Sequence, residues 1–200
     1  ARLSWNDEIV ATLSPPEQRI GPAKITPPPG SFLQATQHGE TSLIETVGNI
    51  LKSASPVLDL FSGCGTFSLP LAQMAEIHAV EGEADMLAAL DKAWRKTQGL
   101  KKISHEKRDL FRRPLLPDEL NKFEAAVIDP PRAGAEAQVT MLAKSTIKTL
   151  AYVSCNPVSF ARDAKILTDA GYSLEAVTPV DQFRWSYHVE LVGAFHKAAA

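Results

Sequence analysis

The chain has 200 residues, 44% hydrophobic and 22% charged, which suits one globular domain or one domain with part of another. Its net charge of −2 lacks the basic excess typical of a protein that binds nucleic acid unaided. No apolar run approaches the roughly 20 residues of a membrane helix, and the N-terminus does not resemble a signal peptide. The two cysteines form no CxxC motif, and the histidines lack metal-ligand spacing. We therefore expect a cytoplasmic protein without a disulfide framework, a metal site or a membrane anchor.

The first elements in the chain are predicted to be short strands. Residues 3–30 combine β-type runs with many prolines, which indicates a β-rich segment distinct from the rest of the chain. From His38 onward the pattern changes, because Leu43, Val47 and Leu51 recur at helical spacing. We therefore divide the chain into a β-rich segment, residues 1–29, and a main domain, residues 30–200.

Strands and helices then alternate along the main domain. Seven strands are predicted at residues 56–61, 77–82, 103–110, 125–131, 150–156, 172–180 and 189–197. A helix over residues 67–75 follows the first strand, and no helix separates the last two. This order predicts an α/β fold with a doubly wound, mainly parallel, seven-stranded sheet. The last two strands should form a hairpin at one edge, so that the last strand runs antiparallel.

A glycine-containing loop follows the first predicted strand, in the sequence "DLFSGCGTFS". Asp59 lies near the end of that strand, and Gly63 and Gly65 precede the next helix. Glu81 ends the second strand, where a carboxylate can accept both hydroxyls of a ribose. Ser68 stands where a dinucleotide-binding loop has its third glycine, and Asp59 would be a poor neighbour for a phosphate. The loop therefore favours S-adenosylmethionine, a sulfonium without phosphate, over a dinucleotide.

Two further strand ends carry reactive or polar side chains. "VIDPPRAG" places Asp129 at the end of the fourth strand with Arg132 just beyond it, which suits either a stiff capped turn or the binding of a nucleobase. Cys155 ends the neighbouring fifth strand, and Pro157 should begin a helix. We expect the helix N-terminus to lower the pKa of the Cys155 thiol.

Cys155 can be a packing residue or a nucleophile, and its predicted surroundings favour the nucleophile. A thiolate that adds to carbon 6 of a pyrimidine turns the ring into an enolate, so that carbon 5 can attack a methyl group. A base must then remove the carbon 5 proton. Glu190, with His188 nearby, is the candidate base unless it is an ordinary exposed strand residue. Cys64 is interpreted as a buried packing residue.

The main domain resembles the RNA uracil-5-methyltransferases, the S-adenosylmethionine-dependent enzymes that make 5-methyluridine in transfer and ribosomal RNA. The resemblance covers roughly residues 30–200 and differs from the family pattern at Thr36 and Thr66, where asparagine is common. It is carried, in the family's order, by "GSFLQAT", "VLDLFSGCGTFSLPLA", "VEGE", "IDPPRAG", "YVSCNPVSFARD" and "YHVELV".

The resemblance implies a role for each matching residue. Cys155 would be the nucleophile and Glu190 the base. Residues expected to bind the cofactor are Gln34, Phe61, Thr66, Glu81, Asp109 and Asp129. Residues expected to contact the target uracil are Gln34, Asp129 and Arg132.

The resemblance also implies a fold, a substrate and a domain organisation. The fold would be the Rossmann-like class I methyltransferase fold, and residues 1–29 would be the remnant of a preceding domain. The substrate would be ribosomal or transfer RNA with the target uridine flipped out, since a stacked uracil cannot present carbon 6 to a thiol. Two alternatives stay open, a class I methyltransferase with another substrate and a cofactor-binding module with little activity.

Overall fold

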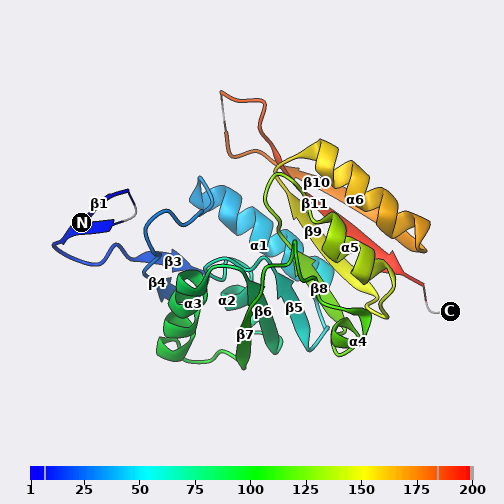
Figure 1. The fold of residues 1–200 in the computed structure, drawn as a ribbon, viewed down its shortest axis with the longest axis horizontal. Helices are drawn as coiled ribbons and strands as arrows, with labels where there is room; N and C mark the ends of the chain where they lie inside the picture. The colour runs from blue at the N-terminus through cyan, green and yellow to red at the C-terminus, as the bar shows by residue number, and fades with distance from the viewer. Residues whose placement is uncertain (7, 184, 199–200) are drawn as a thin grey trace.

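The computed structural model describes residues 1–6, 8–183 and 185–198, and its largest element is a seven-stranded sheet in the order β10-β11-β9-β8-β5-β6-β7 (Figure 1). Its strands are β5 (Val57–Leu60), β6 (Ile77–Glu81), β7 (Ile103–Lys107), β8 (Ala125–Ile128), β9 (Thr149–Ser154), β10 (Tyr172–Val180) and β11 (Glu190–Lys197). All seven predicted strands are present, and the prediction of an α/β fold is confirmed.

The pairing of the strands confirms a mainly parallel sheet with an antiparallel last strand. β5 pairs in parallel with β6 and β8, and the parallel pairing continues to β7 on one side and β9 on the other. β11 pairs antiparallel with both β9 and β10. The terminal hairpin therefore closes one edge as expected, with β10 outermost and β11 inserted between β10 and β9.

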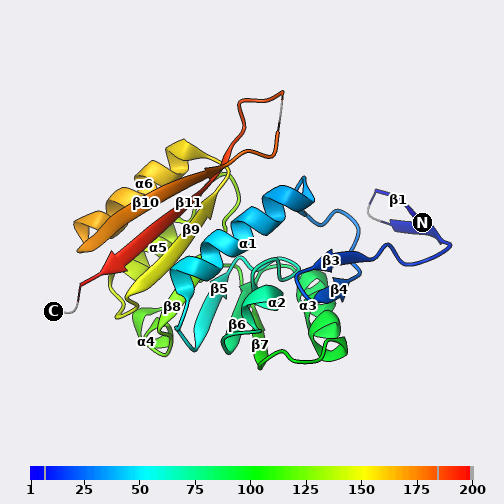
Figure 2. The same cartoon turned by 180° about the vertical axis from the view of Figure 1, so that it is seen from behind.

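Helices cover both faces of the sheet, as Figures 1 and 2 show from opposite sides. They are α1 (Gln37–Leu51), α2 (Ser68–Leu71), α3 (Ala84–Lys96), α4 (Pro117–Leu120), α5 (Glu136–Ala143) and α6 (Pro157–Asp169). Successive strand residues point to opposite faces, so Val57 packs in the core beneath α1, α2 and α3, and Leu58 packs beneath α4, α5 and α6. This alternation buries β5 completely and gives two apolar cores, one on each face.

Two of the predicted helices show what sets their limits. α1 begins at Gln37 because Thr36 caps it, accepting a hydrogen bond from the Gly39 N–H at 3.0 Å on its Oγ1. Threonine and asparagine can both cap a helix in this way, so the departure at Thr36 preserves the structure. The helix predicted over residues 67–75 is shorter, ending at Leu71. Beyond that point the carbonyl of Leu71 accepts from the N–H of Met74 at 2.9 Å and from that of Ala75 at 3.0 Å, so the chain continues in turns of mixed spacing.

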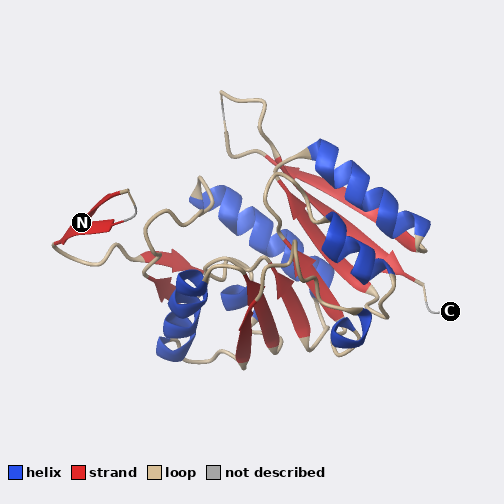
Figure 3. Cartoon of the chain, in the orientation of Figure 1, coloured by secondary structure: helices blue, strands red, loops and turns tan. Residues whose placement is uncertain are grey.

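The segment before residue 30 forms two small hairpins, shown as strands in Figure 3. β1 (Arg2–Trp5) pairs with β2 (Glu8–Thr12), and β3 (Gln18–Ile20) pairs with β4 (Ala23–Ile25). The β3–β4 hairpin buries Ile20 and Ile25 in the core beneath α1 to α3, whereas Trp5 in β1 is 74% exposed. The β3–β4 hairpin is thus packed against the main domain, and a domain boundary at residue 30 stays a prediction. Across the described ranges, no helix has the length and apolar character needed to span a bilayer.

Candidate active site

The polar residues predicted at strand ends gather at one edge of the sheet, where β5, β6, β8 and β9 all end. Because β11 runs antiparallel to β9, its first residues lie at this same edge. Leu191 and Ser154 form the last pair of the β9–β11 ladder, and Glu190 and Cys155 are the next residues beyond that pair. The structure therefore brings the two predicted catalytic residues together from positions 35 apart in the sequence.

The environment of Cys155 differs from the one the sequence predicted. Burial raises the pKa of the Cys155 thiol, and the carboxyl groups of Glu190 and Asp129 raise it further, while the Arg132 guanidinium opposes them. The expectation of a pKa lowered by the helix N-terminus is wrong. Asn156 is the N-cap of α6 and its side chain accepts the first free N–H, that of Val158, at 3.1 Å. Cys155 thus lies outside the helix, before its cap.

The carboxyl groups around the thiol are held in a region of low polarity. Burial, followed by the nearby Glu190 and Asp59, raises the pKa of Asp129 to about 8. Burial alone raises the pKa of Glu190, which is 4% exposed. A negative charge on one of these groups disfavours the ionisation of its neighbour. A cation bound among these groups would favour their ionised forms and lower the pKa of the thiol.

The glycine loop leaves room beside a fixed carboxylate. Gly63 has a φ of +53° with no atom within 4 Å of the position a Cβ would take, so the space above it is open. The Glu81 carboxylate accepts hydrogen bonds from the N–H of Gly63 at 2.9 Å and of Glu83 at 3.0 Å. Thr66 is half-buried in the same loop. The two backbone donors fix the orientation of Glu81 and leave acceptor capacity on both of its oxygens.

Asp59, which the sequence placed near the end of the strand before the loop, lies inside the sheet. It is fully buried in β5, and its Oδ2 accepts a hydrogen bond from Ser68 Oγ at 2.6 Å. Burial raises its pKa to about 7. Within the described residues its Oδ1 and the Oγ of Ser62 are buried without a hydrogen-bond partner. Unsatisfied polar atoms under a glycine loop are typical of a binding site, because a ligand or ordered water completes them.

Two phenylalanines form an aromatic wall at the same edge. Phe61 follows β5 with a φ of +61°, a conformation that strains a bulky residue and that is typical of functional sites. Its ring contacts that of Phe111 with the centroids 5.3 Å apart. Asp109 holds the turn that carries Phe111, since its Oδ1 accepts from the N–H of Phe111 at 3.0 Å and of Arg112 at 3.2 Å. The wall can pack against a planar ring.

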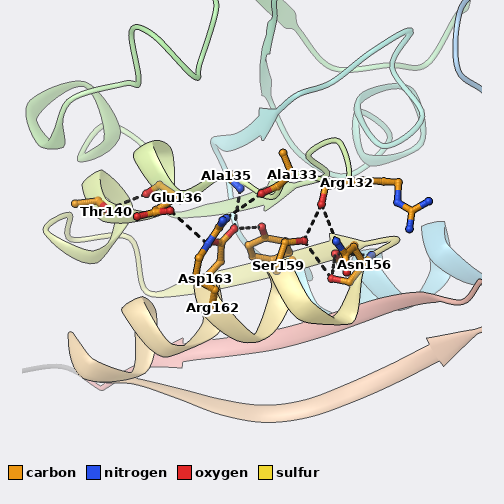
Figure 4. Close-up of polar contacts among 11 residues, drawn as sticks. Arg132, Ala133, Ala135, Glu136, Thr140, Asn156, Ser159, Arg162 and Asp163 are labelled. Carbon is orange, nitrogen blue, oxygen red and sulfur yellow. Dashed lines mark hydrogen bonds and ion pairs between the residues drawn. The ribbon is translucent and has the colours of Figure 1, made fainter.

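The loop after β8 is fixed by the beginning of α6 (Figure 4). The backbone carbonyl of Arg132 accepts hydrogen bonds from Asn156 Nδ2 and from Ser159 Oγ, both at 3.0 Å. These two donors follow Cys155 by one and four residues. The loop that carries Arg132 is therefore attached to the helix that begins beside the thiol.

Asp163, a residue that the sequence did not single out, is the buried centre of this attachment. It is 0% exposed and accepts hydrogen bonds from the Ala135 N–H at 2.7 Å and from the Tyr152 hydroxyl. Arg162 forms an ion pair with it at 2.7 Å and also donates to the carbonyl of Ala133 at 2.9 Å. A signal was present in the sequence, because Asp163 is a charged residue three positions after Phe160 on the apolar face of α6.

Gln34 lies beside Gln182, another residue that the sequence did not reveal. Gln34 is 9% exposed, and its Oε1 accepts a hydrogen bond from Gln182 Nε2 at 2.7 Å. A single glutamine in a loop forms no recognisable pattern, so only the fold could reveal this contact. In the described ranges, no group of histidine, cysteine, aspartate and glutamate side chains could hold a metal ion.

Comparison with known proteins identifies relatives of the chain. A family model described as tRNA (uracil-5-)-methyltransferase matches residues 25–198. An RNA methyltransferase of Mesorhizobium japonicum is 52% identical over 98% of this chain and 48% of its own length. The 23S rRNA (uracil(1939)-C(5))-methyltransferase RlmD of Shewanella halifaxensis is 37% identical over 86% of this chain and 39% of its own length.

A solved structure also matches, namely the Pyrococcus abyssi tRNA (uracil-54, C5)-methyltransferase in complex with S-adenosyl-L-homocysteine. The TM-score is 0.77 at 25% identity, over 90% of this chain and 43% of that one. The chain therefore spans about half the length or less of the relatives it matches. The family resemblance and the class I methyltransferase fold inferred from the sequence are confirmed.

The buried carboxyl groups predict a pH-dependent stability. Asp59, with a pKa of about 7 against an ordinary 3.8, holds a proton in the folded protein that the unfolded chain has released. The resulting stabilisation is present below the unfolded pKa and is lost as pH rises through the folded pKa. The unfolding free energy of Asp59→Asn, minus that of the unaltered protein, should therefore increase from about pH 5 to about pH 8 by ~1 kcal/mol or more, since one pKa unit corresponds to ~1.4 kcal/mol.

Urea denaturation at the two pH values measures this difference. The exposed Asp85 provides the matched control, because Asp85→Asn makes the same chemical change outside the buried site. A difference for Asp59→Asn that does not increase with pH would contradict the raised pKa.

Replacing Asp163 should lower the unfolding free energy much more than replacing the other acidic residue of α6. In Asp163→Asn an amide NH₂ would face the N–H and O–H groups that donate to the carboxylate, and we expect a loss of about 1 to 3 kcal/mol in unfolding free energy, as for a buried polar group left without its partner. Asp169→Asn on the same helix removes an exposed pair with Lys165 and should cost about 1 kcal/mol or less. Denaturant titration of both variants makes the comparison, and equal losses would refute the central position of Asp163.

Proposed function

Because the chain belongs to the tRNA (uracil-5-)-methyltransferase family, we propose that the protein methylates carbon 5 of a uridine in RNA, with S-adenosylmethionine as the methyl donor. The observation that supports this proposal is that Glu190 and Cys155 directly follow the last pair of the β9–β11 ladder, at the edge where the glycine loop also lies. A nucleophile and a base at one edge of the sheet, beside a nucleotide-type loop, match the needs of this reaction.

The side chains at the edge suit S-adenosylmethionine. Glu81 offers oriented carboxylate oxygens for the ribose hydroxyls, and the wall of Phe61 and Phe111 suits the adenine ring. The acidic surroundings of Asp59 and Asp129 suit a ligand that carries sulfonium and ammonium groups. Proposed cofactor contacts are Gln34, Phe61, Thr66, Glu81, Asp109 and Asp129. The family is S-adenosylmethionine-dependent, and the Pyrococcus relative was solved with the demethylated product of this cofactor.

In the proposed reaction the chain's residues act in a fixed order. Cys155 loses its thiol proton to the surrounding carboxylates or water as its sulfur bonds to carbon 6 of the uracil. The ring becomes an enolate, and carbon 5 takes the methyl group as the bond from methyl to cofactor sulfur breaks. Glu190 then removes the proton from carbon 5, the bond from carbon 6 to sulfur breaks, and the thiolate is regenerated. Asp129 and Arg132 are the proposed hydrogen-bond partners of the uracil edge.

The proposed substrate is a uridine flipped out of ribosomal or transfer RNA. The two relatives with named substrates act on a 23S rRNA uracil and on a tRNA uracil. Mapping 5-methyluridine in ribosomal and transfer RNA, with and without the full-length gene, identifies the site. Unchanged 5-methyluridine in both RNA classes would reject the proposal.

Cys155 and Glu190 should fail in different ways when they are replaced. In the full-length protein, Cys155→Ala has no nucleophile, so neither methyl transfer nor a covalent RNA adduct is expected. Glu190→Gln can still add to carbon 6 and methylate carbon 5, but it cannot remove the proton. A methylated covalent complex should therefore accumulate, visible as a shifted band on a denaturing gel.

Cys64→Ala supplies the matched control. Cys64 is a buried packing residue, so its replacement should still allow the adduct to form at Cys155. Mass spectrometry of an adduct with 5-fluorouridine RNA should place the bond at Cys155. Methylation by Cys155→Ala at the normal rate would overturn the covalent mechanism.

Glu81 should be required for cofactor affinity. Glu81→Ala removes a charged acceptor for the ribose, so S-adenosylhomocysteine should bind about tenfold to a hundredfold more weakly, as expected for a lost hydrogen bond to a charged group. Glu83→Ala, two residues along with an exposed side chain, keeps the backbone N–H that contacts Glu81 and should bind normally. Calorimetry that gives equal affinities for the two variants would reject the ribose assignment.

A further inference from the structure

Gln182 links the segment before α1 to the loop between β10 and β11, and it does so through both ends of its side-chain amide. Its Oε1 accepts a hydrogen bond from the N–H of Thr36 at 3.4 Å, and its Nε2 donates to Gln34 Oε1 at 2.7 Å. Gln182 is only 8% exposed. The contacts join positions separated by 146 and 148 residues.

The series of hydrogen bonds from Thr36 through Gln182 to Gln34 allows only one arrangement of donors and acceptors. A backbone N–H donates and cannot accept, so the oxygen of the Gln182 amide must face Thr36. The nitrogen of that amide then faces Gln34, which must present its oxygen in return. The two N–H groups on Nε2 of Gln34 have no hydrogen-bond acceptor among the described residues. This nitrogen is not among the buried atoms that lack a partner. Gln34 thus has both N–H groups of its Nε2 available for whatever binds beside it, while its Oε1 already accepts from Gln182.

The surrounding backbone is shaped around Gln182. A Cβ on Gly39, in the first turn of α1, would overlap the Cγ, Cδ and Oε1 of Gln182. The N–H of the same Gly39 donates to the Oγ1 of the N-cap Thr36. The absence of a side chain at Gly39 therefore lets the amide of Gln182 reach the helix cap and Gln34.

The contact lies next to the candidate active site. Val180, the last residue of β10, pairs with Glu190, and Gln182 follows it by two residues. The contact therefore fixes Gln34 close to the edge that carries Glu190 and Cys155. Through Gln182, the loop that leads to the base is coupled to the segment that carries Gln34.

We propose that Gln182 is a positioning residue that fixes the side-chain amide of Gln34 so that its N–H groups face the active site. The ligand group that fits there is an acceptor oxygen, either a carbonyl of the target uracil or the carboxylate of the cofactor's amino-acid portion. This inference rests on the proposed function. If the acceptor is the uracil 4-carbonyl, the same geometry disfavours cytosine, which presents an amino group at that position.

Gln182→Glu tests the proposal by reversing the order of donors and acceptors at almost constant shape. The new carboxylate can accept from Thr36 but cannot donate to Gln34, so the Gln34 amide should rotate, donate to the carboxylate and turn its oxygen toward the site. Gln182→Met removes both hydrogen bonds without imposing the rotated state and should have a smaller effect. Gln37→Glu, with the same charge change at an exposed position of α1, controls for added negative charge.

Two measurements on the full-length protein distinguish the two acceptor oxygens. One is the affinity for S-adenosylhomocysteine, and the other is the rate of covalent adduct formation with 5-fluorouridine RNA at saturating cofactor. We expect Gln182→Glu to lower one of them by about tenfold or more, as for a lost donor facing a charged or buried acceptor. A loss of cofactor affinity identifies the carboxylate, and a slower adduct at normal affinity identifies the uracil carbonyl.

The side-chain amide signals in nitrogen-15 NMR test the positioning without any ligand. The amide protons of Gln182 should exchange slowly with water in the unaltered protein, and those of Gln34 rapidly; in Gln182→Glu the Gln34 protons should become protected. Equal exchange of Gln34 in both proteins, or cofactor affinity and adduct rate both within about twofold of the Gln37→Glu control, would overturn the proposal. An unaltered protein that forms no adduct would reject the proposed function but leave this exchange result standing.

Discussion

The antiparallel direction of β11 is the constraint on which the active site depends. In a purely parallel sheet every strand would end at the binding edge, and only strand ends could supply residues there. β11 starts at that edge, so its first residue, Glu190, lies next to Leu191, which pairs with the last residue of β9. The insertion of β11 between β9 and β10 also shields it on both sides, which places a carboxyl group that is 4% exposed beside a thiol.

That placement gathers carboxyl groups whose ionisation is unfavourable. Burial disfavours the ionised forms of Asp59, Asp129 and Glu190, and the nearby Glu190 and Asp59 disfavour the ionisation of Asp129 further. The Cys155 thiol has a raised pKa for the same reasons. A cationic cofactor would favour the ionised carboxyl groups and the thiolate at the same time. Burial thus makes the ionised forms of these carboxyl groups costly, and the proposed reaction would depend on the same groups.

Both loops at the site are held by buried polar side chains that bond to backbone groups. Asp163 accepts from the Ala135 N–H and binds Arg162, which in turn donates to the Ala133 carbonyl. Gln182 acts similarly on the other side of the sheet edge, through Thr36 and the side chain of Gln34. Such contacts fix the backbone of loop segments that lack the hydrogen bonds of a helix or a strand. The segments that carry the Cys155 thiol, the Glu190 carboxyl group and Gln34 are thereby attached to the same framework.

The sequence by itself determined the seven strands, the antiparallel last strand and the positions of Cys155, Glu190 and Asp129 at strand ends, because these follow from local periodicity and from ordered motifs. It predicted the wrong direction for the pKa shift of the Cys155 thiol and did not reveal the burial of Asp59, since burial and neighbouring charges are properties of the packed chain. It also did not reveal Gln182, whose partners lie 146 and 148 residues away. Only the tertiary structure decided the register that joins β11 to β9 and the direction of the Gln182 hydrogen bonds, because both depend on contacts between segments that have no pattern in common.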